Sequence, residues 1–456
     1  MGFLFIAHLS ADDPGDFPYP AGKRSSTENT EKPDMNRTLR KVLPIVIASL
    51  LIVKSAFATD GYFLTGYGTK QQGQGGAGVA KPGDSLAGAT NPAGLTLVGN
   101  RLDFGLTLFR PNRSATIIGN QLPPGYPNVN GTYDANRVKN FELPELGYSF
   151  QYRPNLALGV AIYGNGGLDT SYTKPIGLFG ITRGGVDIEQ VFISPTLAYK
   201  AGAHNSFGVA ANIAIQRFSA EGLQNFVSLS SDPAHLTNTG HSYDAGGGVR
   251  VGWLGELNTA VSVGATYQTR TYLSKFNRYS GLFAEHGGFD VPANFAGGAA
   301  VKLGSKATLL FDEERILYGQ VKSIANTLAS TSPLGSDNGP GFGWHDINVS
   351  KVGLNYEVNP SLILRGGYNH GGVPFDGSQT FFNILAPAVT KDHLHVGATV
   401  SLEGGKEFSF AYIHAFNNSI NGLNSIPAAY GGGNAILSMY QNSFQVAFGW
   451  NRDKKK

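Results

Sequence analysis

The stretch "LDFGLTLF", residues 102–109, alternates apolar side chains with small or polar ones. The apolar parity comprises Leu102, Phe104, Leu106 and Leu108. Successive side chains of a β-strand point to opposite faces of the sheet, so this stretch predicts a strand with one apolar face. In a membrane, such a strand needs a closed barrel, because closure leaves no backbone group unpaired in the hydrocarbon.

The same period of two recurs along the chain and predicts fourteen strands in all. A tilted membrane strand needs roughly 9–11 residues, and the predicted strands have about this length. The thirteen others span residues 145–153, 155–163, 189–200, 206–217, 242–253, 259–271, 291–302, 306–318, 345–357, 360–370, 392–402, 407–416 and 441–450.

One of these strands, 345–357, has an ambiguous pattern. Its residues Ile347 and Val349 have one parity, whereas Val352, Leu354 and Tyr356 have the other. A β-bulge would reconcile the two halves. The alternative is that the strand is wrongly assigned.

The connections between the predicted strands alternate in length. Six are short, among them "AGAHN" between the fourth and fifth strands and "EGGK" between the twelfth and thirteenth. The seven others run to about 20 or 30 residues, which places all turns at one end of the sheet and all loops at the other. This alternation predicts an all-β, fourteen-stranded antiparallel transmembrane β-barrel over residues 101–456.

The composition agrees with a barrel and excludes other classes. There are 62 Gly, 28 Phe and 20 Tyr but only 15% charged residues, which favours short aromatic strands over helices. The mean hydropathy of −0.12 argues against a helical membrane bundle. A net charge of +3, without a basic run before the terminal lysines, argues against nucleic acid as a partner. The chain has no cysteine, so it has no disulfide and no thiolate metal site.

Residues 35–58 resemble a secretory signal peptide. A basic start is followed by the apolar run 42–53 and by Ala56-Phe57-Ala58, a typical cleavage site. The mature chain would then begin at Thr59. Residues 1–34 are interpreted as an upstream extension from a misplaced start codon, with a regulatory N-terminal tail as the alternative.

A glycine-rich segment precedes the first strand. Gly73, Gly75 and Gly78 fit the G-x-G-x-x-G spacing of a dinucleotide-binding turn. That motif needs a buried strand before it and a helix after it, but Lys81-Pro82-Gly83 breaks any helix here. The small residues of 59–100 instead predict a compact hatch, or plug, folded inside a narrow lumen.

Several segments of this chain resemble the FadL/TodX family of outer-membrane transporters for hydrophobic compounds. The resemblance rests on "GYGTKQQGQGGAGVA", on Asn91-Pro92-Ala93 ahead of the first strand, and on "VGLNYEVNPSLILRGGYNHGGVPFD" and "NILAPAVTKDHLHVGATV" near the end. It implies a monomeric barrel in the outer membrane of a Gram-negative bacterium, surrounded by lipid and lipopolysaccharide. It also implies uptake of long-chain fatty acids or comparable hydrophobic molecules, without a cofactor. The tail after Trp450 departs from barrels that end on an aromatic residue.

The resemblance also implies a route for the solute. A hatch movement around Asn91-Pro92-Ala93 and the glycines at 73, 75 and 78 would release it, and it would leave sideways at a distorted third strand. Glycines that permit such a kink are Gly159, Gly164 and Gly166.

Two sets of residues are candidates for contact with the solute. Apolar loop pairs that contain Phe179, Phe283 and Phe381 would form an outer groove, or would only pack the loops together. The cations Arg365, Arg270 and Lys275 would bind a carboxylate, or would pair with acids of the lumen such as Asp312 or Glu145. His393 and His395 share a strand face, but two ligands make no metal site, so no metal is expected.

Other functions stay open at this point. Within the family, uptake of alkanes or aromatic hydrocarbons is the close alternative to fatty acids. A general porin, an adhesin or a barrel enzyme is the alternative from another class. The hatch argues against a porin, and no G-x-S-x-G elbow or paired-acid cluster supports an enzyme.

Overall fold

The computed structural model describes residues 60–453. The predicted upstream extension, the signal peptide, Thr59 and the last three lysines therefore lie outside the described residues. Within 60–453, no helix has the length and hydropathy needed to cross a membrane.

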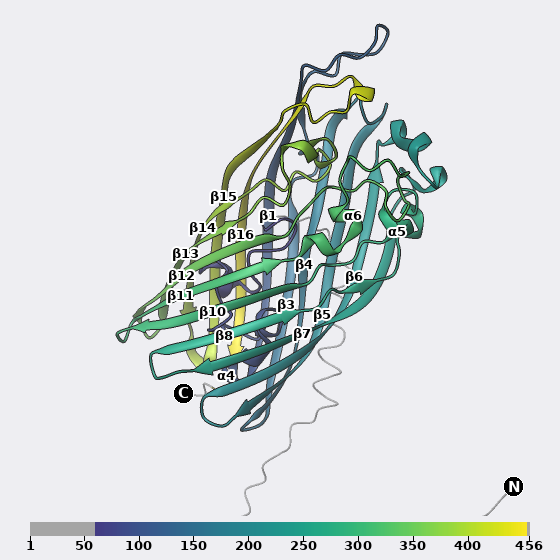
Figure 1. Ribbon diagram of the computed structural model, residues 1–456. Coiled ribbons are helices and arrows are strands. Elements are labelled where there is room, and N and C mark those ends of the chain that lie inside the picture. Colours follow the sequence, from purple (N-terminus) through teal and green to yellow (C-terminus); the bar gives the residue numbers. More distant parts are fainter. Residues whose placement is uncertain (1–59, 454–456) are drawn as a thin grey trace, which may run out of the picture. The chain divides into compact units, whose positions relative to one another are not determined.

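Fourteen antiparallel strands form a closed ring (Figure 1), and β1 pairs with β16 to close it. Each of the fourteen predicted strands overlaps one strand of this ring, so the predicted fold is confirmed. The ring consists of β1 (Arg101–Ile118), β3 (Phe141–Arg153), β4 (Leu156–Pro175), β5 (Arg183–Ala201), β6 (Asn205–Glu221), β7 (Ser242–Glu256), β8 (Val261–Gln268), β10 (Asn294–Leu303), β11 (Ala307–Ile316), β12 (Ile347–Asn359), β13 (Leu362–Gly371), β14 (Asp392–Ser401), β15 (Lys406–Gly422) and β16 (Asn434–Asn451). Two short strands lie off the ring, β2 (Gly131–Asp134) on β1 and β9 (Tyr272–Leu273) on β7.

The six short turns lie at one end of the barrel and the loops at the other (Figure 1). Two loops are shorter than predicted: the loop after β4 is residues 176–182 and the loop after β15 is residues 423–433. The prediction of about 20 or 30 residues for them was wrong because strand pairing continues past the length that crosses a membrane. β4 and β5 have 20 and 19 residues.

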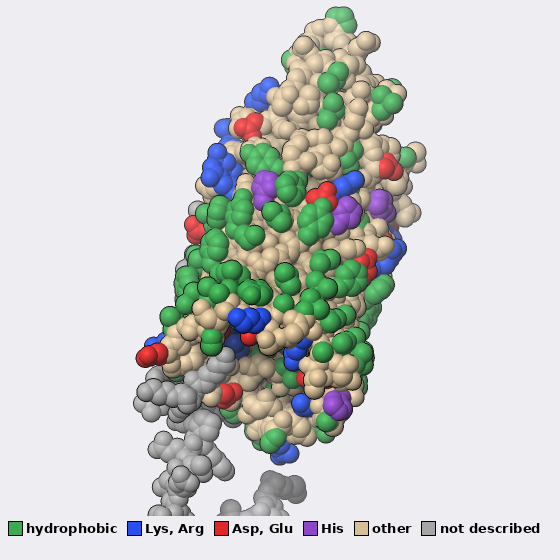
Figure 2. Space-filling model, turned by 90° about the vertical axis from the view of Figure 1, so that its left-hand side faces the viewer, with side chains coloured by type: hydrophobic (Ala, Val, Ile, Leu, Met, Phe, Trp, Pro, Cys, Tyr) green, Lys and Arg blue, Asp and Glu red, His purple; other side chains and the backbone are tan. Residues whose placement is uncertain are grey.

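The outer surface carries an apolar band, which Figure 2 shows on one side of the barrel. Phe104, Leu106 and Leu108 of β1 are exposed on it, whereas Asp103 and Thr107 of the same strand are buried. The alternation read from residues 102–109 is thus the alternation between lipid and lumen.

The ambiguous strand β12 keeps one register along β11, from Ala307↔Tyr356 to Ile316↔Ile347, so its parity change needs no bulge. Val352, Leu354 and Tyr356 face outward, while Ile347 and Val349 face inward and are buried. The inward pair belongs to a large apolar cluster inside the loop end of the barrel. Apolar residues on the lumen parity therefore mark the height at which the interior becomes apolar.

Short helices lie in the hatch and in the connections between the strands. Near the turn end lies the hatch, with α2 (Thr69–Gln72), α3 (Ala87–Thr90), η1 (Pro92–Gly94) and α4 (Leu95–Val98). The remaining helices are η2 (Gln224–Leu229), η3 (Pro233–His235), η4 (Asn277–Tyr279), α5 (Ala284–Gly287), η5 (Tyr318–Gln320), α6 (Lys322–Ala325), η6 (Gly377–Gln379), α7 (Thr380–Asn383), η7 (Glu403–Gly405) and η8 (Ala428–Tyr430). All of them except η7, which lies in a turn, belong to the loops. The loops thus build an apolar interior above a hatch made of small residues.

Candidate ligand-binding pocket, hatch and side gap

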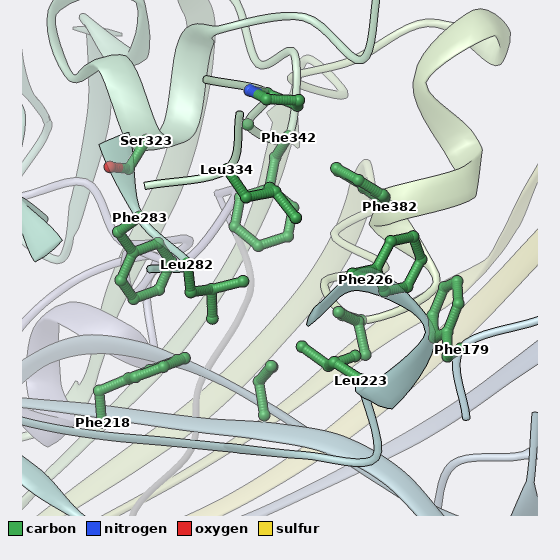
Figure 3. Close-up of a pocket in the computed structure, with 14 residues that line it drawn as sticks. Phe179, Phe218, Leu223, Phe226, Leu282, Phe283, Ser323, Leu334, Phe342 and Phe382 are labelled. Carbon is green, nitrogen blue, oxygen red and sulfur yellow. The ribbon is translucent and has the colours of Figure 1, made fainter. Parts of the chain in front are cut away.

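An apolar pocket of ≈520 Å³ lies inside the loop end of the barrel (Figure 3). Its walls come from β5, β6 and five loops, so no single segment builds it. Fourteen residues line it: Phe179, Val186, Phe218, Leu223, Phe226, Leu282, Phe283, Ser323, Leu334, Pro340, Gly341, Phe342, Phe382 and Leu385. Its aromatic rings pack on one another, as Phe218 does on Phe283 with centroids 4.6 Å apart.

Ser323 brings the one polar side chain among these fourteen residues. Its Oγ donates a hydrogen bond to the Gly288 carbonyl at 2.5 Å. In Figure 3 the oxygen points away from the labelled aromatic rings. Since the described lining has no charged side chain, the pocket offers a ligand apolar contacts only.

A second cavity, the outer groove of ≈860 Å³, adjoins the pocket. The two share Phe226, Leu334, Pro340 and Phe382. The groove also carries serines of the loops, Ser228, Ser230, Ser330 and Ser332. Only the side chains that line both cavities thus separate a molecule in the groove from the pocket, and no strand lies between them.

The predicted aromatic contacts divide between these two cavities. Phe179 and Phe283 line the pocket, while Phe381 lines the groove. The rings of Phe381 and Phe179 lie 5.3 Å apart, so they connect the two cavities. That they bind a solute stays a prediction.

The hatch glycines lie against glycines of the barrel wall. A Cβ on Gly73 would be 3.1 Å from Gly397 Cα, and a Cβ on Gly367 would be 2.2 Å from the Gly75 nitrogen. Gly75 also has a φ of +76°, a backbone conformation that residues with a Cβ rarely adopt. The glycines are therefore needed because two backbones approach closely here.

Gly78 does bind an anion, but the anion belongs to the barrel. The amides of Gly78 and Val79 donate to the Asp312 carboxylate of β11 at 2.7 and 2.9 Å. In the same way the amides of Gly68 and Thr69 donate to Glu145 of β3, each at 3.1 Å. Both acids that were alternative partners for the cations thus hold the hatch backbone instead.

Asn91-Pro92-Ala93 forms a second contact between hatch and wall. Asn91 Nδ2 donates to the Val79 carbonyl at 2.8 Å and to the Trp253 carbonyl of β7 at 2.9 Å, and its Oδ1 accepts from the Ala93 amide at 3.1 Å. Pro92 and Ala93 pack on Gly208 of β6, where a Cβ would be 2.3 Å from the Ala93 nitrogen. Asn91 therefore ties two parts of the hatch to the wall.

A gap separates the upper parts of β3 and β4. In the described structure their pairing runs from Arg153↔Leu156 to Leu146↔Ile162 and then stops, although β4 continues to Pro175. The pairing of β4 with β5 shifts register between Gly164 and Gly166. The hatch reaches this edge, since the Gly167 amide donates to the Tyr62 carbonyl at 3.0 Å. Gly159 lies below the gap, in the paired region, under Leu95 of α4.

A family model for outer membrane transport proteins (OMPP1/FadL/TodX) matches residues 49–445 of this chain. The chain belongs to that family. It is an outer-membrane β-barrel of a Gram-negative bacterium, and the family consists of channels for hydrophobic compounds.

Solved structures share the fold at low sequence identity. The toluene transporter TodX of P. putida is 18% identical, with a TM-score of 0.63 over 85% of this chain and 99% of that one. A FadL homologue of Pseudomonas aeruginosa is 14% identical, with a TM-score of 0.65 over 86% and 100%. The toluene transporter TbuX of Ralstonia pickettii is 16% identical, with a TM-score of 0.58 over 85% and 98%. A sequence search of curated proteins found no match.

The three cations considered for carboxylate binding in this family member lie outside the pocket lining. Arg270 Nε donates to Asp290 Oδ2 at 2.7 Å, and Arg365 Nη1 donates to Thr399 Oγ1 at 2.7 Å near the turn end of β13. Lys275 is exposed on a loop. The structure does not bring the three together.

A buried ion cluster at the base of the hatch escaped the sequence analysis. Lys70 of α2 and Arg101 of β1 both pair with Glu407 of β15, and Arg101 also pairs with Asp103 at 2.5 Å. The Ser85 amide of the hatch donates to Asp103 at 2.9 Å. The sequence did show charged residues at lumen-facing positions near the strand ends. It did not show that these positions, on strands far apart in the sequence, lie next to one another in the barrel.

His393 and His395 are both fully buried on the lumen face of β14. His395 Nδ1 lies 2.6 Å from the Gln72 carbonyl of the hatch, a hydrogen bond in which the ring nitrogen donates. Among residues 60–453, no group of three or more His, Asp or Glu side chains is placed to hold a metal ion.

Proposed function

We propose that this chain takes up neutral hydrophobic molecules, aromatic hydrocarbons or short alkanes, through its apolar pocket. The observation that carries the proposal is the pocket lining, which has no charged residue and whose single hydroxyl donates to backbone. An ionised carboxylate placed there would lose its hydration without gaining a partner. Fatty acids, which the sequence analysis placed first, are therefore the second candidate.

The aromatic and aliphatic lining of the pocket also favours a neutral apolar ligand. Burial of each methylene contributes about 0.8 kcal/mol, so such a ligand gains several kcal/mol on leaving water.

The proposed route has three steps. The solute first enters the outer groove, then passes the shared residues Phe226 and Phe382 into the pocket. It finally leaves sideways through the gap between β3 and β4, near Gly164 and Gly166, when the hatch segment at Tyr62 moves away from β4. A lateral exit releases an apolar solute into lipid and spares it the polar hatch. We expect the protein to act as a monomer surrounded by outer-membrane lipid and lipopolysaccharide.

A charge placed in the pocket tests the proposal. Leu282→Lys lies in the pocket lining, while Leu257→Lys, on the exposed turn after β7, is the matched control. A deletion strain complemented with each variant is assayed for uptake of labelled toluene, an alkane and oleate. We expect Leu282→Lys to abolish uptake of the neutral compounds and Leu257→Lys to leave it unchanged. If the unaltered chain restores uptake of oleate alone, fatty acids are the substrate. If it restores uptake of none of the three compounds, the protein is not a channel for hydrophobic molecules.

A further inference from the structure

The upper end of the gap between β3 and β4 is crossed by a single arginine. Arg113 lies on the lumen parity of β1 and is 2% exposed. Its Nη1 donates to the Asp169 carboxylate of β4 at 2.9 Å and also to the Asp169 carbonyl, and its Nη2 donates to the Val138 carbonyl at 2.7 Å. The guanidinium stands over the ring of Phe141, the first residue of β3, at 5.7 Å from the centroid. Arg113 therefore contacts both sides of the gap and the segment between them.

That segment, residues 135–138, takes the place of β3 beside the upper part of β4. Asn136 forms a parallel bridge with Ser171 of β4, and the Arg137 amide donates to the Ser171 carbonyl at 3.0 Å. Asn136 is also fixed to Arg113, since its Oδ1 accepts from the Arg113 amide at 2.9 Å and its Nδ2 donates to the Arg113 carbonyl at 3.0 Å. Side-chain contacts and one bridge thus do here what a strand ladder does elsewhere in the barrel.

The surroundings place Arg113 between two spaces. On the lumen side lies an apolar cluster of Phe109, Phe141 and Leu143, with Leu64 of the hatch against it. On the outer side, a recess of ≈980 Å³ is lined by Val138, Phe141 and Asp169 among others, and it shares Val186 with the apolar pocket. A solute that moves from the pocket toward the outer side at this height meets Val138 and Asp169, the partners of the buried guanidinium.

We propose that Arg113 is the positioning residue that holds the upper end of the side gap shut, and that lateral exit requires its contacts with Asp169 and Val138 to break. The inference rests on the lateral exit in the proposed function. Because no β3–β4 ladder exists here, these contacts set how often segment 135–138 separates from β4. A buried guanidinium with charge-assisted hydrogen bonds holds a geometry that an apolar side chain of similar size does not.

A reversible cross-link tests the closed state directly, since the chain contains no cysteine. Asn136 and Ser171 form a parallel bridge, and neighbouring backbones of a sheet lie roughly 4.7–4.9 Å apart, within disulfide range. In the double variant Asn136→Cys/Ser171→Cys, we expect oxidation to stop uptake of the neutral solute and a reductant to restore it. The control pair Tyr148→Cys/Val160→Cys joins β3 and β4 where they are already paired, and its uptake should not depend on oxidation.

Two further variants test the arginine itself. Arg113→Met and Asp169→Asn should speed release of a fluorescent hydrophobic probe from the reconstituted protein on the order of tenfold, since one hydrogen bond to a charged group is worth about that factor. Arg113→Lys should release the probe at an intermediate rate. A purely structural arginine would change heat-modifiable mobility without changing the release rate.

The outcomes separate this inference from the proposed function. Normal uptake by the oxidised Asn136→Cys/Ser171→Cys pair, or an unchanged release rate in Arg113→Met, overturns the role of Arg113. If Leu282→Lys still blocks uptake in that case, the channel function stands and only the closing device is wrong. If Leu282→Lys also transports normally, the proposed function fails together with it. If Arg113→Met does not fold, the cross-link still tests whether segment 135–138 must separate from β4.

Discussion

The contact between hatch and wall at Gly367 gives a quantitative prediction. A Cβ added at Gly367 of β13 would lie 2.2 Å from the Gly75 nitrogen and 2.4 Å from the Gln74 carbonyl carbon, and backbone atoms cannot move aside singly. At Gly366, one residue earlier, the nearest atom to an added Cβ is the His395 carbonyl oxygen at 3.9 Å. Gly367→Ala should therefore push the hatch from the wall, while Gly366→Ala should not.

The size of the effect follows from overpacking, which typically costs about 1–3 kcal/mol. Such a cost shifts the ratio of displaced to docked hatch by roughly 5–150-fold. We expect Gly367→Ala to make the hatch accessible to protease and to raise permeation of a small hydrophilic solute into liposomes by a factor in this range. Heat-modifiable mobility should be unchanged, because β13 pairs with its neighbours through backbone groups, which the added methyl group does not replace. Equal permeation and equal protection in Gly367→Ala and the unaltered protein would refute the reasoning that backbone proximity holds the hatch.

Three further predictions concern the hatch. Asp312→Ala leaves two hatch amides without an acceptor, at about 1–3 kcal/mol for each buried group, and should raise protease cleavage of residues 66–80 more than Glu313→Ala on the outward face. Asn91→Ala removes the bonds to β7 and should lower solute uptake with heat-modifiable mobility intact; unchanged uptake would contradict a role in gating. Burial raises the pKa of the Asp60 carboxyl to about 7, whereas an undocked hatch would release this proton above about pH 4. Docking of the hatch should then be strongest at low pH and weaken as the pH rises through 7. In a protease-protection titration, Asp60→Asn should abolish this pH dependence. If Asp60→Asn keeps the same dependence, another group is responsible for it.

The sequence predicted what depends on neighbours in the chain. The period of two in residues 102–109 reflects one strand between lipid and lumen, so all fourteen strands could be found from it. The lengths of β4 and β5 could not, because beyond the membrane their pairing no longer needs an apolar outer face.

The candidate site depended on contacts between distant segments, and here prediction was partial. Phe179 and Phe283 could be recognised as apolar loop residues, but that they share one pocket follows from how separate loops pack. Asp312 and Glu145 were correctly placed on the lumen parity, yet their partners are hatch amides, which every residue except proline carries and which no pattern distinguishes. Arg113 attracted no notice, because its importance comes from the absence of β3 at its height.

The order of the hatch and the first strand has a consequence for biogenesis. The hatch ends at Val98, and β1 begins at Arg101 and pairs with β16 along all of its 18 residues. The hatch is thus connected directly to β1, one side of the β1–β16 pairing. It has to lie inside the curved sheet before β1 and β16 pair, because backbone contacts such as Gly75 on Gly367 leave no space for it to enter the closed barrel. The hatch therefore acts as a core around which β1 and β16 meet during folding. Substitution of its glycines should slow barrel assembly or leave it incomplete, in addition to impairing transport.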